Sequence, residues 1–97
     1  MTVHWTRIAL EHLAAIRAYI ASSSPRYAQR FVNRIVRHSE RLARFPLIGA
    51  AVPEYDDETI REVLEYPHRI IYKVLADRID ILAVIHGAQN LPRTPPE

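Results

Sequence analysis

Apolar residues near the start of the chain recur at the spacing of an amphipathic helix. They repeat every three or four positions over about residues 7–21, which is the period of one helix face. Thr6 precedes this segment, and a threonine side chain can accept a hydrogen bond from a free N–H of the first helical turn. The expected buried stripe consists of Ala9, Leu13, Ile16 and Ile20, widened by Ile8 and Tyr19.

A second helix is predicted over about residues 25–44. Serines followed by Pro25 favour a new helix start, because the first helical position does not need the N–H that proline lacks. Phe45 is pushed out of helical geometry by Pro46, so the helix ends there. The short turn makes the two helices an antiparallel hairpin. The expected inner face of the second helix comprises Ala28, Phe31, Val32, Ile35, Ser39 and Leu42.

The second half of the chain has the pattern of strands. Residues 46–59 read as a loop with room for a short edge strand near Ala51 and Val52. The runs that follow are rich in Ile, Val, Leu and Tyr, which favours extended structure. The last run is apolar on both faces, so we expect it inside the sheet. The predicted strands are 3–5, 60–65, 69–75 and 79–86.

These elements predict an α+β fold in the order β-α-α-β-β-β. Each helix has a stripe to bury, and a small antiparallel sheet needs a cover, so the helical hairpin should pack on one sheet face. The other face is then left partly open. We expect a single domain over residues 1–91, followed by a flexible, proline-rich tail at 92–97.

Composition narrows the classes of function. The chain has 97 residues, of which 48% are hydrophobic, and no cysteine, so thiolate metal sites and disulfides are excluded. Its five histidines are not spaced as metal ligands, and we expect neither a metal nor another cofactor. Neither a signal peptide nor a run long enough to span a membrane is evident, which predicts a cytoplasmic protein.

The charges are segregated along the chain. Residues 26–44 hold six arginines and one acid, whereas residues 54–65 hold six acids and one arginine. Five of the arginines share one helix face: Arg30, Arg34, Arg37, Arg41 and Arg44. The stripe could meet an acidic partner or phosphates. Alternatively it is a solvated face whose guanidinium groups pair with the acidic loop, and we rank this slightly ahead.

The chain resembles the ParE/RelE toxin superfamily, which includes plasmid stabilisation proteins, over residues 4–91. The segments that carry the likeness are "HWTRIALEHLAAIRAYIA", "SSSPRYAQRFVNRI", "RLARFPLIGAAVPE" and "IREVLEYPHRIIYKVLADRIDILAVIHGA". The resemblance implies the same β-α-α-β-β-β fold. It also implies a growth-arresting toxin of a type II toxin–antitoxin system, neutralised by a small antitoxin.

Two mechanisms occur in that superfamily. RelE-like members cut messenger RNA on the ribosome, and the candidates here are Arg61 and Arg69 as phosphate clamps, His86 as acid or base, and Glu65 as base. Where the nuclease pattern has an arginine after the last strand, this chain has Gly87–Gln89. The arginines and glutamates could instead form cross-strand pairs, and a structural role for His86 is favoured about two to one.

The resemblance therefore favours a ParE-like toxin that is not an enzyme and inhibits DNA gyrase. The alternatives are a RelE-like ribosome-dependent endoribonuclease and an inactive relative that only binds antitoxin. The expected antitoxin is a ribbon-helix-helix protein with a disordered tail that folds on binding. We expect no membrane contact, and DNA contact only through the antitoxin. The candidate antitoxin-binding residues are Tyr19, Tyr27, Arg30, Arg34 and Arg37.

Overall fold

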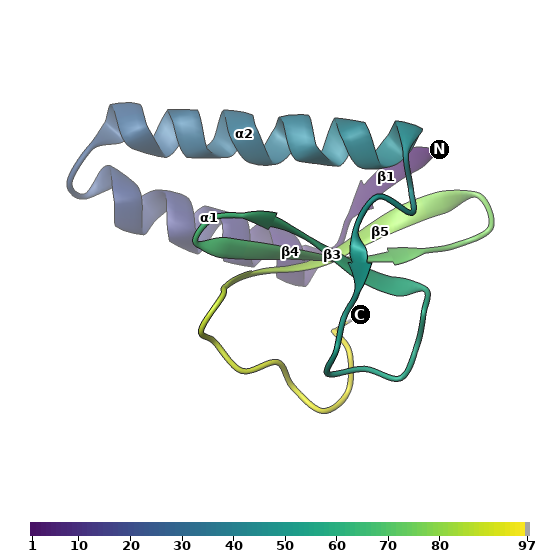
Figure 1. Cartoon of the computed structure of the whole chain (residues 1–97). Helices are drawn as coiled ribbons and strands as arrows, with labels where there is room; N and C mark the ends of the chain where they lie inside the picture. The colour runs from purple at the N-terminus through teal and green to yellow at the C-terminus, as the bar shows by residue number, and fades with distance from the viewer. Residues whose placement is uncertain (97) are drawn as a thin grey trace.

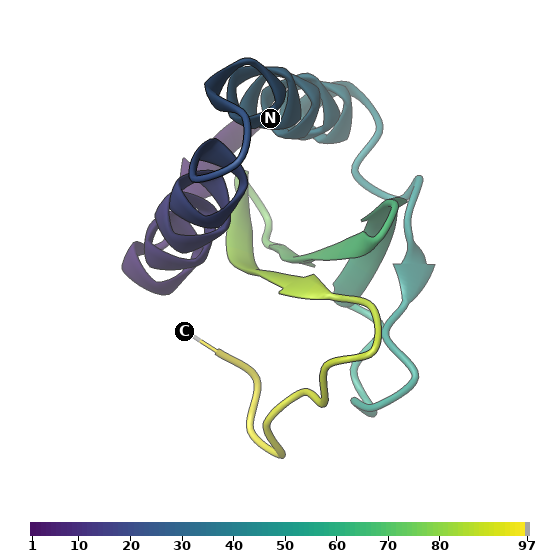
Figure 2. The same cartoon turned by 90° about the vertical axis from the view of Figure 1, so that its left-hand side faces the viewer.

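A computed structural model describes residues 1–96 and has the predicted α+β class and element order. Two helices pack against a single sheet, and a loop and the C-terminal segment lie on its other side (Figures 1 and 2). Three of the expected strands begin one residue earlier than predicted, and the short edge strand lies one residue earlier. The elements are β1 Thr2–Trp5, α1 Arg7–Ala21, α2 Pro25–Arg44, β2 Ala50–Ala51, β3 Ile60–Glu65, β4 His68–Val74 and β5 Arg78–His86.

Both helices begin at the predicted caps. The Thr6 hydroxyl accepts the N–H of Ala9 at 3.2 Å and donates to the carbonyl of Ile81 at 2.7 Å, so the same residue starts α1 and attaches it to β5. The Ser24 hydroxyl accepts the N–H of Tyr27 at 3.2 Å, with proline at the first helical position of α2. Within residues 1–96, neither helix combines the length and apolarity needed to cross a membrane.

The sheet is mixed, which corrects the expectation of an antiparallel sheet. Its five strands lie in the order β1-β5-β4-β3-β2, and β1 runs parallel to β5 while the other neighbours are antiparallel. Residues 2–5 pair with 78–81, so the partners come from opposite ends of the chain. Hairpin turns fix the direction of β3, β4 and β5, but no local signal in the sequence gives the direction of so distant a partner.

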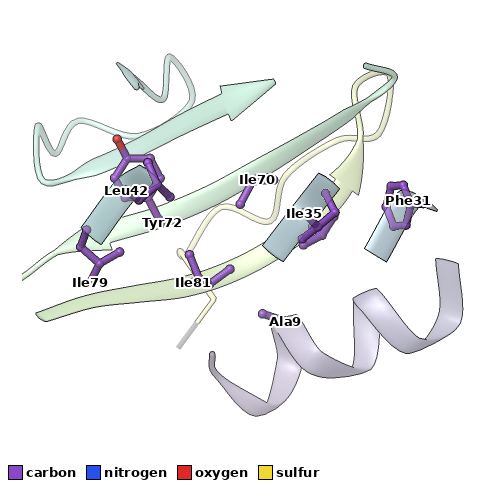
Figure 3. Packing of buried hydrophobic residues seen from close by; sticks show 9 residues of the cluster. Ala9, Phe31, Ile35, Leu42, Ile70, Tyr72, Ile79 and Ile81 are labelled. Atoms are coloured by element: carbon purple, nitrogen blue, oxygen red, sulfur yellow. The ribbon is translucent and has the colours of Figure 1, made fainter. Parts of the chain in front are cut away.

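The main core lies between the helices and the sheet, and it confirms the predicted inner face of α2 and the central stripe of α1 (Figure 3). Phe31, Ile35 and Leu42 of α2 are at most 3% exposed. Trp5 is partly buried against the same cluster. The cluster comprises Ala9, Phe31, Ile35, Leu42, Ile70, Tyr72, Ile79, Ile81 and Val84, with Leu13, Ile16, Ile20 and Val32 packed against it.

Tyr19 does not belong to the buried stripe, contrary to the sequence prediction. Its side chain is 81% exposed. Tyr19 lies in the last turn and a half of α1. At 3.6 residues per turn, its direction from the helix axis differs by about 80° from that of Ala9, where the buried stripe begins. The hairpin turn projects beyond the end of the sheet at this point (Figure 1), so little is available to cover the ring.

The face expected to be open carries a second apolar cluster. Tyr55 from the loop and Leu91 from the C-terminal segment pack against it, and the Tyr55 hydroxyl donates to the carbonyl of Pro92 at 2.8 Å. The loop and the C-terminal segment therefore cover part of this face. Of the tail predicted at 92–97, Glu97 lies outside the described residues. The cluster comprises Val52, Ile60, Ile71, Leu82, Ala83 and Ile85.

Gly49 allows the segment after α2 to approach the sheet closely. Its N–H donates to the buried hydroxyl of Tyr72 at 3.0 Å, and that hydroxyl donates to the carbonyl of Pro46 at 2.8 Å. A Cβ at residue 49 would lie 2.3 Å from the backbone oxygen of Glu62. Burial raises the pKa of Tyr72, so the phenol stays protonated and able to donate.

The packing of α2 gives a direct test of the fold. Ile35→Ala removes a side chain that is fully buried between helix and sheet, and it should lower the free energy of unfolding by about 2–5 kcal/mol. The neighbouring Val36 is 41% exposed, so Val36→Ala should change stability by about 0.5 kcal/mol or less. Urea denaturation of both variants measures the difference. Equal losses would show that α2 does not present this face to the sheet.

Candidate functional site

Arg69 is held by two carboxylates. From β4 its side chain points to the face that carries the loop, where it is only 10% exposed. Nε donates to Glu62 Oε1 at 2.8 Å and Nη2 to Glu62 Oε2 at 3.0 Å. Nη1 and Nη2 donate to the two carboxylate oxygens of Glu54 at 2.8 and 2.9 Å. Four of its five N–H donors are thus used within the protein.

The carboxylates around Arg69 set the electrostatics of this cluster. The hydrogen bond from Arg69 lowers the pKa of Glu54, and the bonds to Glu54 and Glu62 raise the pKa of Arg69 further. One guanidinium between two carboxylates leaves a net charge of −1. An incoming phosphate would therefore meet a carboxylate excess at this point and would have to displace bidentate ion pairs.

Arg61 is also engaged by the protein, but elsewhere. Its Nε donates to the carbonyl of Gly49 at 2.9 Å and its Nη1 to the carbonyl of Glu58 at 3.0 Å. The residue is opposite Tyr72 in the β3–β4 register and so shares the helix-facing side of the sheet. Arg61 thus holds the loop on both sides of β2, which is a structural role.

His86 forms a pair with His68 at the end of the sheet. The two rings meet edge to face with centroids 5.9 Å apart, and Phe31 of α2 contacts His68 in the same way at 5.1 Å. Burial, and secondarily His86, lowers the pKa of His68, which is therefore neutral at pH 7. Among the described residues, Nδ1 of His68 is buried without a hydrogen-bond partner. His86 Nδ1 accepts the N–H of Ala88 at 3.1 Å.

The structure brings two of the three candidate catalytic residues to one hollow, since Arg69 and His86 both line a cavity of about 340 Å³ at the end of the sheet and Arg61 does not. Arg69 is opposite Ile85 and His86 is opposite His68, so alternation along the strands places Arg69 and His86 on opposite faces of the sheet. Arg61 shares the face of His86 but sits four residues along β3 from the end where His86 lies, a separation of roughly 13 Å. One phosphate cannot contact all three side chains.

Glu65 belongs to a cluster with α2 that sequence reasoning missed. Its carboxylate accepts from Arg34 Nε at 2.8 Å and contacts Nε2 of His38. The signal was present in the helical spacing of residues 34 and 38, but the partner strand depends on the tertiary fold. Among the arginines of the stripe, Arg34 alone has an ion pair within residues 1–96, so the expected pairing with the acidic loop is wrong. This pairing also removes Glu65 as a free base.

The remaining candidate antitoxin-binding residues are accessible. Tyr19 is 81% and Tyr27 59% exposed, on either side of the hairpin turn. The guanidinium of Arg30 lies over the Tyr27 ring at 5.9 Å from its centroid. Arg37 is exposed on the outer face of α2. Tyr27 and Arg30 thus form one contact surface, while Arg34 is occupied by Glu65.

The two sheet edges differ in accessibility. The first half of β5 pairs with β1, and the N–H groups on the remaining edge of β5 are already bonded. The N–H of Val84 donates to Nδ1 of His12 at 3.2 Å, and the N–H of His86 donates to the side chain of Gln89 at 3.3 Å. On the other side, β2 pairs only with the first part of β3, which leaves the edge of residues 63–65 without a neighbouring strand. A hollow of about 310 Å³ adjoins this edge, lined by residues including His38, Arg41, Ile48 and Leu64. Its lining combines basic and apolar side chains with one acid, Glu62, which is bound to Arg69.

Within residues 1–96, the structure contains no group of three His, Cys, Asp or Glu side chains placed to hold a metal ion. The polar side chains at the end of the sheet and on its loop side are the arginines, glutamates and histidines described above. Most of these groups bind one another, and Arg69, His68 and His86 also line a shared hollow of about 340 Å³.

Three comparisons place the chain among known proteins. The model of the family described as "ParE toxin of type II toxin-antitoxin system, parDE" matches residues 3–91. The protein named Toxin RelE2 of Caulobacter vibrioides is 35% identical over 88 residues, covering 90% of this chain and 96% of that protein. A solved structure of the chromosomal ParDE system from P. aeruginosa aligns with a TM-score of 0.72 at 29% identity, over 89% of this chain and 95% of that one. The chain is a member of the ParE toxin family of type II toxin–antitoxin systems.

Proposed function

We propose that this toxin arrests growth in the cytoplasm by binding DNA gyrase, without a catalytic centre of its own, and that a cognate antitoxin neutralises it. The observation that carries the proposal is the state of Arg69, whose guanidinium is occupied by Glu54 and Glu62. A toxin that acts by binding does not need a free phosphate clamp at this position.

The spatial distribution of charge and acid–base groups supports the same conclusion. Attack by a ribose 2′-hydroxyl requires a base, an acid and a cation within hydrogen-bond reach of one phosphate. Arg69 and His86 lie on opposite sheet faces, and Arg61 is bonded to two backbone carbonyls. The residue types of a nuclease are present, but their geometry is that of separate structural contacts.

A ribosome-dependent nuclease is the second candidate, because of the histidine pair. His68, His86 and Arg69 border a hollow of about 340 Å³ that Tyr66 and Leu64 also line. A neutral His68 beside an accessible His86 could divide acid and base roles. The similar Caulobacter protein also carries the name RelE2. The guanidinium of Arg69 is held by Glu54 and Glu62, so an RNA substrate in this hollow would have to displace those ion pairs or recruit another cation.

The antitoxin is proposed to bind through two features of this fold. Exposed aromatic rings near a helical hairpin are suited to anchor an amphipathic helix, and Tyr19 and Tyr27 are such rings. The free edge of β3 can accept an additional extended segment, because its main-chain groups at residues 63–65 have no neighbouring strand. A disordered tail joined to a ribbon-helix-helix domain could occupy both and fold as it binds.

A supercoiling assay tests the target. The purified toxin should inhibit supercoiling of relaxed plasmid by gyrase, and it should leave messenger RNA intact in a translation reaction. The antitoxin-bound toxin is the control, in which inhibition should be relieved. Message cleavage without gyrase inhibition would favour the ribonuclease mechanism, and the absence of both would favour an inactive relative that binds antitoxin.

The Arg69 cluster predicts a stability that depends on pH. Because the folded-state pKa of Glu54 is lowered, its contribution is present above the ordinary glutamate pKa and is lost as the pH falls through the lowered value. Glu54→Gln should therefore reduce the unfolding midpoint at pH 7 more than the matched loop variant Glu58→Gln does. That difference should shrink in acid, in thermal melts from pH 7 down to pH 3. A difference independent of pH would contradict an ionic role for Glu54.

Antitoxin binding gives a further test. Tyr19→Ala combined with Tyr27→Ala should weaken binding to the product of the adjoining short reading frame by at least about tenfold, since buried aromatic anchors dominate such interfaces. Leu10 is exposed on the opposite flank of α1, and Leu10→Ala serves as the control. Titration calorimetry measures both affinities. Unchanged affinity in the tyrosine variant would place the antitoxin elsewhere.

A further inference from the structure

The outer face of α2 carries arginines whose charge the protein leaves unneutralised. Five of them are exposed, and within the described residues none has a carboxylate at ion-pair distance. At 3.6 residues per turn they lie within about 60° of one another and nearly opposite the buried face of α2. We call them the arginine ridge: Arg26, Arg30, Arg37, Arg41 and Arg44.

The tertiary structure moves the compensating acids to the other side of the molecule. The loop with the acidic residues at 54–58 lies beyond the sheet from α2 in both views (Figures 1 and 2). Glu54 and Glu62 are bound to Arg69, and Glu65 takes up only Arg34. A net charge of +2 thus conceals one strongly positive side and one negative side.

The shape and chemistry of the ridge fit a duplex better than a protein. It runs for roughly 27 Å along a convex helix. The core of a protein–protein interface is rich in apolar groups and holds few charges besides single arginines, whereas this ridge presents five arginines in succession. Guanidinium groups bind phosphate oxygens in a bidentate way, which a linear polyanion can offer along the whole ridge.

Among nucleic acids, double-stranded B-form DNA is the best match. Single strands are bound by aromatic side chains that stack on successive bases, whereas the two rings beside the ridge, Tyr27 and Phe45, lie towards its ends and are each covered by an arginine of the ridge. The major groove of A-form RNA is too narrow for side chains to read, whereas that of B-DNA, about 12 Å wide, admits a helix. Contacts from the ridge would be to backbone phosphates, which carry no sequence information.

We propose that the arginine ridge of α2 is a sequence-independent binding surface for duplex DNA. The toxin itself then contacts DNA, which departs from the expectation that only the antitoxin does so. The inference goes beyond gyrase inhibition and does not depend on it, because the surface is complete in the isolated chain. Near a DNA-bound target the ridge would raise the local concentration of toxin.

Fluorescence anisotropy with a labelled 24-base-pair duplex of arbitrary sequence tests this, using the free toxin without gyrase. The dissociation constant should fall near 10⁻⁴–10⁻⁶ M at physiological salt and rise steeply with salt concentration. Arg37→Gln combined with Arg41→Gln should reduce the slope of log K against log salt by about 1.8, or about 0.9 for each lost phosphate contact. Both sites are exposed, and a thermal melt verifies that the variant is folded.

The matched control is Arg7→Gln combined with Arg17→Gln on α1, which removes the same charge from another exposed helix surface. This variant should retain the wild-type salt slope. Equal effects in the two variants would overturn the proposal, since net charge alone would then account for binding. Tighter binding of a single strand or of duplex RNA, or no measurable DNA binding, would also overturn it. A gyrase assay that fails while duplex binding persists would contradict the proposed target only.

Discussion

Burial of β5 on both faces is the constraint on which the rest of the structure depends. Ile79, Ile81 and Val84 face the helices, and Ala83 and Ile85 belong to the cluster on the other side, all at most 5% exposed. The strand also joins the two ends of the chain, since β1 pairs with it in parallel and β4 in antiparallel orientation. The helical hairpin, the loop and the C-terminal segment are all positioned by contact with this strand or its neighbours. The two sides of the sheet are thereby kept apart.

That separation determines how the charges act. The glutamates nearest the sheet form ion pairs with arginines beside them. Glu65 pairs with Arg34 on the helix side, and Glu54 and Glu62 pair with Arg69 on the loop side. The remaining acids of the loop cannot reach the outer face of α2 across the sheet. A chain that looks nearly neutral therefore presents opposite potentials on its two sides. A negatively charged partner is attracted to the outer face of α2, and a positively charged partner to the side that carries the acidic loop.

Successive side chains along a strand point to opposite faces of the sheet, and this alternation separates residues that look like a catalytic set in the sequence. Arg69 and His86 occupy neighbouring strands, yet the register directs them to opposite faces. Family membership consequently establishes a toxin of a toxin–antitoxin system, while the mechanism has to be argued from what each side chain contacts. In this fold those contacts favour recognition of a partner over chemistry.

The sequence by itself determined what depends on neighbours within a few residues. The caps at Thr6 and Ser24, the extent of both helices and the inner face of α2 follow from local hydrogen bonding and the 3.6-residue period. Only the tertiary structure decided the parallel pairing of β1, the exposure of Tyr19 and the partners of Arg69 and Glu65. These features depend on contacts between residues distant in sequence, such as positions 2–5 with 78–81, and neither periodicity nor spacing encodes the direction or the face on which distant segments meet.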